Sequence, residues 1–106
     1  KTFNMKFKHN WEFNTTEELN NIFTEGKKEL NDLIVDTAIK NLKTKRVTIP
    51  VVSIYTKDED MTFDVMIDRP DMVETLEQNL LTMEEYEDYE RCQQIVKALD
   101  YLKLNS

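Results

Sequence analysis

The sequence predicts an α+β fold, in which a small antiparallel or mixed three-stranded sheet packs against a long helix from the N-terminal half and against C-terminal helices. Three observations support this class: polar and apolar residues alternate over 2–13, a helical apolar stripe runs from 16 to 43, and two strand-like runs follow at 47–56 and 61–68. The expected order is β-α-β-β-α-α. A length of 106 residues suits a single compact domain, 1–106.

The first element has the period of two that is typical of a strand with one buried face. Phe7, His9, Trp11 and Phe13 fall on one face of it. We interpret His9 as a hydrogen-bonded strand residue at the edge of the core rather than as a ligand.

The second element begins at a capping box, Thr15 followed by Glu18, whose side chains satisfy the first free amides of a helix. Apolar residues then recur at steps of three and four as far as Leu42. The phase continues through Gly26, which favours one helix from Thr16 to Lys43. Such a helix would be about 40 Å long, which is long for so small a domain. A break at Gly26 is therefore the alternative.

The third and fourth elements form a predicted hairpin, because the runs 47–56 and 61–68 are joined by four polar residues. Pro50 cannot donate a ladder hydrogen bond, which predicts an edge or a bulge there. Strict alternation would point Val52, Ile54 and Met66 away from the helices. A small sheet with apolar residues on both faces needs a second cover. These three residues are therefore a secondary candidate partner-binding or dimer face, with a helix, a partner or a second copy of the chain as its cover.

The C-terminal region predicts a short helix over 72–80 and a longer one to about 104, the second beginning at a capping box of Thr82 and Glu85. Acidic residues with two tyrosines crowd its start. Rings give contact area at low entropic cost and carboxylates steer a basic partner, so this segment is the main candidate partner-binding site. A solvated helix face is the alternative. The candidate residues are Glu84, Tyr86, Glu87, Asp88, Tyr89 and Glu90.

Catalytic and metal chemistry find little support, so we expect no enzyme, no catalytic residue, no metal and no cofactor. Cys92 is the single cysteine and falls on an apolar stripe, where a thiol behaves as a small hydrophobic group. The single glycine excludes a glycine-rich phosphate loop. Carboxylates between Asp58 and Asp71 leave a small carboxylate-dependent metal enzyme as an alternative.

The expected core combines residues from every predicted element. Its members are Phe7, Trp11, Phe13, Ile22, Leu30, Leu33, Ile34, Phe63, Val65, Val96 and Leu99.

Charge is distributed unevenly. The net charge is −7, with nine Lys/Arg and seven Asp/Glu in residues 1–48 against five and fourteen in residues 49–106. An acidic field attracts basic protein surfaces and repels nucleic acid and anionic lipid. The leading hypothesis is a cytoplasmic, non-enzymatic inhibitor or adaptor that binds a basic protein surface of a nucleic-acid-handling machine. In one version of this hypothesis the protein is phage-encoded and imitates nucleic acid. The hypothesis includes no membrane contact and no direct contact with nucleic acid. The alternative is a nucleic-acid-binding module that uses Lys6, Lys8, Lys40, Lys43, Lys45 and Arg46 on one face.

Overall fold

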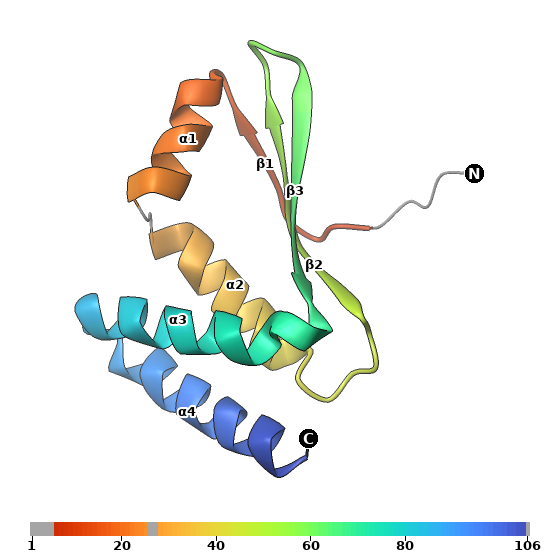
Figure 1. Cartoon of the computed structure of the whole chain (residues 1–106). Coiled ribbons are helices and arrows are strands. Elements are labelled where there is room, and N and C mark those ends of the chain that lie inside the picture. The colour runs from red at the N-terminus through yellow and green to blue at the C-terminus, as the bar shows by residue number, and fades with distance from the viewer. Residues whose placement is uncertain (1–5, 26–27, 106) are drawn as a thin grey trace.

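The computed structural model describes residues 6–25 and 28–105 and contains a three-stranded sheet and four α-helices (Figure 1). This confirms the α+β class. The elements in order are β1 (Asn10–Phe13), α1 (Thr16–Glu25), α2 (Lys28–Lys40), β2 (Thr48–Thr56), β3 (Met61–Asp68), the 3₁₀ turn η1 (Arg69–Asp71), α3 (Met72–Glu85) and α4 (Tyr89–Leu104).

The sheet is mixed, with β2 between the other two strands. β1 pairs with β2 in parallel, and β2 pairs with β3 as the predicted antiparallel hairpin. The first strand is shorter than expected, because regular pairing covers only Asn10–Phe13 and residues 1–5 lie outside the described part. Further backbone bonds extend the pairing at both ends, since the Ser53 amide donates to the His9 carbonyl at 3.0 Å and the Asp58 amide to the Asn14 carbonyl at 3.1 Å. His9 itself is exposed rather than placed at the core edge.

A β-bulge at Val51 changes the orientation of the second strand. Pro50 lies opposite Met66 and Val52 opposite Val65, so Val51 is the extra residue. An extra residue reverses the face of every side chain that follows it. Val52 and Ile54 are consequently fully buried, and their expected placement on an outer face is wrong. Of the three residues proposed for that face, Met66 alone is exposed, at 46%.

The N-terminal helical region consists of two helices in place of one. The predicted capping box is confirmed, because the Thr15 amide donates to Glu18 Oε1 at 3.1 Å and the Glu18 amide to Thr15 Oγ1 at 3.2 Å. α1 ends at Glu25 and α2 begins at Lys28, so a continuous helix is wrong. The break considered at Gly26 lies outside the described residues.

The helices cover the sheet on one side. Figure 1 shows α1 and α2 beside the sheet, with α3 and α4 as an antiparallel pair that packs against α2. The boundary between α3 and α4 differs from the prediction. α3 continues to Glu85, and Asp88 rather than Thr82 caps α4, accepting a hydrogen bond from the Arg91 amide at 3.2 Å. Glu87, in the turn, has a positive φ of 59°.

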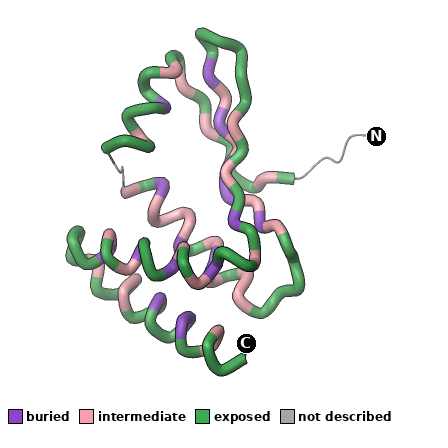
Figure 2. The backbone as a smooth tube through the Cα atoms, in the orientation of Figure 1, coloured by how far each residue is buried: buried purple, intermediate pink, exposed green. Residues whose placement is uncertain are grey.

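The core lies between the sheet and the helices and continues between α2, α3 and α4 (Figure 2). Of the predicted core, Leu30 and Leu99 are buried, whereas Val96 is 45% exposed, so its placement is wrong. The reason is helical phase, because α4 turns Ile95, Ala98 and Leu99 inward instead. Phe7 is half-buried. Other predicted members are partly buried against the core: Trp11, Phe13, Ile22, Leu33, Ile34, Phe63 and Val65.

Candidate functional site

A cleft of about 710 Å³ lies between the segment that precedes β1, the C-terminal part of α2 and the start of β2. We name it the basic cleft. Its lining residues are Lys6, Phe7, Lys8, His9, Leu33, Asp36, Thr37, Lys40, Asn41, Thr44, Arg46, Pro50 and Val51.

Four cationic side chains converge on the basic cleft from three segments. Lys6 and Lys8 precede β1, Lys40 ends α2, and Arg46 lies in the loop before β2. The carboxylate in the lining, Asp36, is already engaged by the guanidinium of Arg91, with Nε to Oδ1 at 3.0 Å and Nη2 to Oδ2 at 2.9 Å. The lining therefore holds four cationic side chains against one carboxylate, which Arg91 also contacts, and the cleft has an excess of positive charge.

These four cations form no salt bridge within residues 6–25 and 28–105. Lysines and arginines elsewhere in the same ranges do, among them Lys28, Lys57 and Arg91. In a chain with a net charge of −7, carboxylates are abundant partners. A cleft that keeps its cations unpaired concentrates positive potential and attracts anions.

Arg69 fixes the loop that forms one wall of the cleft. Its guanidinium donates to the carbonyl oxygens of Asn41 at 3.0 Å, Leu42 at 3.3 Å and Thr44 at 2.8 Å, and to that of Arg46 at 2.9 Å. One side chain thereby connects four carbonyl groups of the loop between α2 and β2. The position of Arg46 therefore depends on Arg69, which the sequence analysis did not single out.

The basic residues considered from the sequence meet only in part. Lys6, Lys8, Lys40 and Arg46 line the cleft, but Lys43 and Lys45 do not. The ammonium group of Lys43 instead lies 5.3 Å from the centre of the Tyr101 ring. The parallel pairing of β1 with β2 brings the lysines before β1 close to Lys40 and Arg46, because it places residues 6–9 beside the start of β2.

The acidic segment proposed as a partner-binding face is divided by the turn between α3 and α4. Asp88, in this turn, is largely covered, its side chain being 14% exposed. Its Oδ2 accepts hydrogen bonds from Lys28 Nζ and from Arg91 Nη1, each at 2.8 Å. These bonds hold the pKa of the Asp88 carboxyl well below its usual range and raise the pKa of Lys28. Asp88 thus joins the starts of α2 and α4.

The other members of that segment surround the turn and are exposed: Glu84, Tyr86, Glu87, Tyr89 and Glu90. Tyr86 has the ammonium of Lys28 6.0 Å from its ring centre. These residues form a cluster on a turn and not the continuous helix face that we expected.

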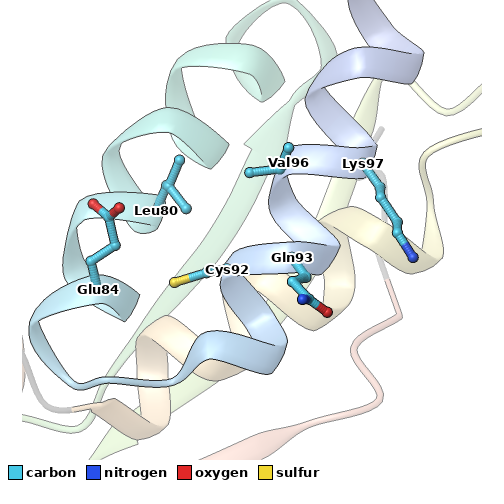
Figure 3. A pocket seen from close by; sticks show the side chains of 6 residues that line it. All are labelled: Leu80, Glu84, Cys92, Gln93, Val96 and Lys97. Carbon is cyan, nitrogen blue, oxygen red and sulfur yellow. The ribbon is translucent and has the colours of Figure 1, made fainter.

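A second hollow lies between α3 and α4, with a volume of about 420 Å³. We name it the α3–α4 groove. Figure 3 shows Leu80, Cys92 and Val96 at its centre, with Glu84 and Lys97 at its two ends and Gln93 beside Lys97. Burial, followed by the charges of Glu84 and Asp88, raises the pKa of the Cys92 thiol. The thiol form is therefore favoured over the nucleophilic thiolate.

The carboxylates of the β2–β3 hairpin make separate structural hydrogen bonds and do not form one cluster. Asp58 caps α1, because both of its oxygens accept from the Thr16 amide at 3.0 Å. Asp64 accepts from the Ser53 hydroxyl at 2.7 Å. Across residues 6–25 and 28–105, His, Cys, Asp and Glu side chains form no group of three that could hold a metal ion.

Comparison with protein-family models, with curated protein sequences and with solved structures finds no match. Within the part of the chain that the structure describes, the longest helices are too polar or too short to cross a membrane.

Proposed function

We propose that this protein is a nucleic-acid-binding module that holds a short single-stranded segment in the basic cleft. One observation supports the proposal above all: Lys6, Lys8, Lys40 and Arg46 come from distant parts of the sequence, meet in one cleft and have no carboxylate partner within the described residues. Lysine and arginine contacts to phosphate oxygens supply most of the affinity in such complexes.

The aromatic content of the cleft favours single strands. Phe7 and His9 alternate with Lys6 and Lys8 along the wall before β1. Flat rings beside cations suit a strand whose bases are unstacked, because the rings stack on bases while the cations contact the backbone. The ring of Phe7 is half-buried, so its exposed part offers a stacking surface to an unpaired base.

The overall charge limits the length of strand that the module holds. Acidic side chains cluster at the hairpin connection, in residues 58–60, and around the α3–α4 turn. Phosphates that extend beyond the cleft would meet the field of a chain whose net charge is −7 and be repelled. We therefore infer a short contact of a few nucleotides rather than a long track along the surface.

The test is fluorescence anisotropy with labelled single-stranded DNA, single-stranded RNA and duplex DNA at two salt concentrations. Lys8→Gln, Lys40→Gln and Arg46→Gln should each weaken single-strand binding and reduce the slope of log K against log salt by about 0.7. Lys45→Gln is the matched control, because Lys45 is exposed in the same loop but does not line the cleft.

Two results would contradict the proposal. One is the absence of single-strand binding by the native chain at low salt. The other is an equal loss in Lys45→Gln and in the cleft variants, which would indicate nonspecific attraction by the whole surface. Tighter binding of the duplex than of the single strand would reject the single-strand preference.

The acidic turn supports a second candidate function, the binding of a basic protein. Tyr89 is 63% exposed beside the exposed carboxylates of Glu87 and Glu90. Asp88 is not part of this candidate binding surface, because its charge is already engaged by Lys28 and Arg91. An oligolysine peptide should bind the native chain, and Glu87→Gln with Glu90→Gln should slow its association. An association rate unchanged at low salt would reject this candidate.

A further inference from the structure

The α3–α4 groove has an apolar centre that the fold leaves uncovered. Leu80 and Cys92 are partly buried there, and Val96 is 45% exposed (Figure 3). Tyr89 precedes Gln93 by four residues and Val96 by seven, which places it on the same side of α4. This face of the α3–α4 pair therefore combines apolar and aromatic groups in contact with solvent.

The groove also carries one charge of each sign. Glu84 lies on α3 near the turn, and Lys97 lies on α4 more than one helical turn beyond Cys92, so the two mark opposite ends of the groove (Figure 3). Within the described residues neither side chain takes part in a salt bridge. Glu84 and Lys97 have opposite charges and could therefore pair with each other if the two ends of the groove met.

A twofold axis would bring those ends together. In a symmetric dimer the same patch meets itself, so that residue i of one copy contacts residue j of the other and the reverse contact also forms. The twofold axis would lie in the interface, across the groove and perpendicular to the line from Glu84 to Lys97. The acidic end of one copy then faces the basic end of the other. The same axis also places the apolar centre of one copy on that of the other.

We propose that a second copy of this chain occupies the α3–α4 groove, forming a twofold dimer in which Glu84 of each copy pairs with Lys97 of the other. The charge pattern selects this occupant, because a groove with one acidic and one basic end is complementary to itself. Val96 and Leu80 form the dry centre of the interface, and Cys92 of each copy lies close to the axis.

The dimer leaves the basic cleft accessible. The residues that line the groove and those that line the cleft have no member in common. The assembly therefore presents two basic clefts. The proposal does not depend on nucleic-acid binding, since its measurements concern only the association of two copies of the chain.

The experiment is a charge exchange followed by sedimentation equilibrium. Glu84→Lys alone and Lys97→Glu alone each convert two attractive pairs into two repulsive pairs. Each should weaken dimerisation by on the order of tenfold or more. The double variant, Glu84→Lys with Lys97→Glu, restores both pairs with reversed polarity and should return the equilibrium to near the native value. Glu85→Lys is the control, because it reverses an exposed neighbouring charge outside the groove lining.

A short bismaleimide supplies an independent readout. Cys92 is the single cysteine of the chain, so a covalent dimer reports that two Cys92 thiols lie close together. We expect crosslinking in the native chain, a decrease in each single charge variant at the same protein concentration, its return in the double variant and its absence in Cys92→Ala.

Three outcomes would overturn the proposal: a monomeric mass at every concentration of the native chain, a dimer that both single reversals leave intact, or a double variant as weak as the single ones. Circular dichroism of each variant keeps these outcomes interpretable, because the exchanged residues are exposed and their replacement should leave the helical signal unchanged.

Discussion

Arg69 donates two hydrogen bonds to Thr44, one to its carbonyl oxygen at 2.8 Å and one to its hydroxyl oxygen at 2.9 Å. The two residues belong to different parts of the fold, since Arg69 begins the turn after β3 and Thr44 lies in the loop after α2. Arg69 thereby connects the hairpin to the loop that carries Arg46. The shape of the basic cleft depends on this connection.

Arg69→Met should lower the free energy of unfolding by about 2–4 kcal/mol, because several carbonyl groups lose a charged donor at once. Urea denaturation measures this loss. Arg46→Met is the control and should change stability by less than about 0.5 kcal/mol, since its side chain is exposed. Equal stabilities of the two variants would show that the Arg69 bonds contribute nothing. Arg69→Met should also weaken oligonucleotide binding without removing a cleft cation.

The bulge at Val51 can be tested through the residues that it turns inward. Ile54→Ala should cost about 2–5 kcal/mol, because Ile54 is fully buried. Met66→Ala should cost less than about 1 kcal/mol, because Met66 faces solvent. Chemical denaturation of both variants gives the comparison. A larger loss in Met66→Ala than in Ile54→Ala would mean that the strand has the unbulged register.

Asn79 lies on the buried stripe of α3 with Leu76 and Met83. Its Nδ2 donates to the Thr75 carbonyl at 2.9 Å, but its Oδ1 is buried and has no hydrogen-bond partner among the residues that the structure describes. Asn79→Leu keeps the branched shape and the number of side-chain heavy atoms and removes this uncompensated acceptor, so it should stabilise the protein by about 1 kcal/mol. Thermal unfolding measures the change. A destabilised Asn79→Leu would indicate that the amide has a role beyond packing.

Stability at acidic pH should depend on Asp88. Its pKa is lower in the folded chain than the ordinary value of 3.8, so its contribution is complete above about pH 4 and is lost as the pH falls further. Asp88→Asn should therefore be less stable than the native chain at pH 7, and the difference should shrink below about pH 4. Asp58, whose pKa is also lowered, adds a similar acid dependence that Asp88→Asn retains. Urea unfolding over a pH series tests this, and a gap that stays constant into acid would contradict it.

Local patterns predicted the type of most elements, because periodicity and capping act between near neighbours. The box of Thr15 and Glu18 and the hairpin after Val47 are examples. The turn at Asp88 was missed because two local caps compete in this stretch, the box of Thr82 with Glu85 and the side chain of Asp88. The ion pair with Lys28 that supports the cap at Asp88 forms only in the folded chain. An edge position or a bulge was expected at Pro50, but the effect of the bulge on Val52 and Ile54 requires the register with β3.

The candidate site was less predictable than the fold. Its cations were visible in the sequence, but their meeting depends on the parallel pairing of Trp11 with Ile54, which periodicity does not specify. Similarly, nothing in the spacing of Glu84 and Lys97 indicates that they mark the two ends of one groove.

The parallel edge strand also has a kinetic consequence. The β2–β3 hairpin and the α3–α4 pair form between neighbours in the chain, whereas β1 reaches β2 only after two helices have been traversed. Long loop closure is slow and entropically unfavourable, so β1 should join the sheet late in folding and detach first from the native state. The amide protons of Ser53 and Lys57, which donate to His9 and Phe13, should accordingly exchange with solvent faster than those shared by β2 and β3. Each detachment of β1 separates the wall of the cleft that carries Lys6 and Lys8 from the wall that carries Arg46. The cleft therefore has an intrinsic route by which a nucleic-acid strand can enter from the side.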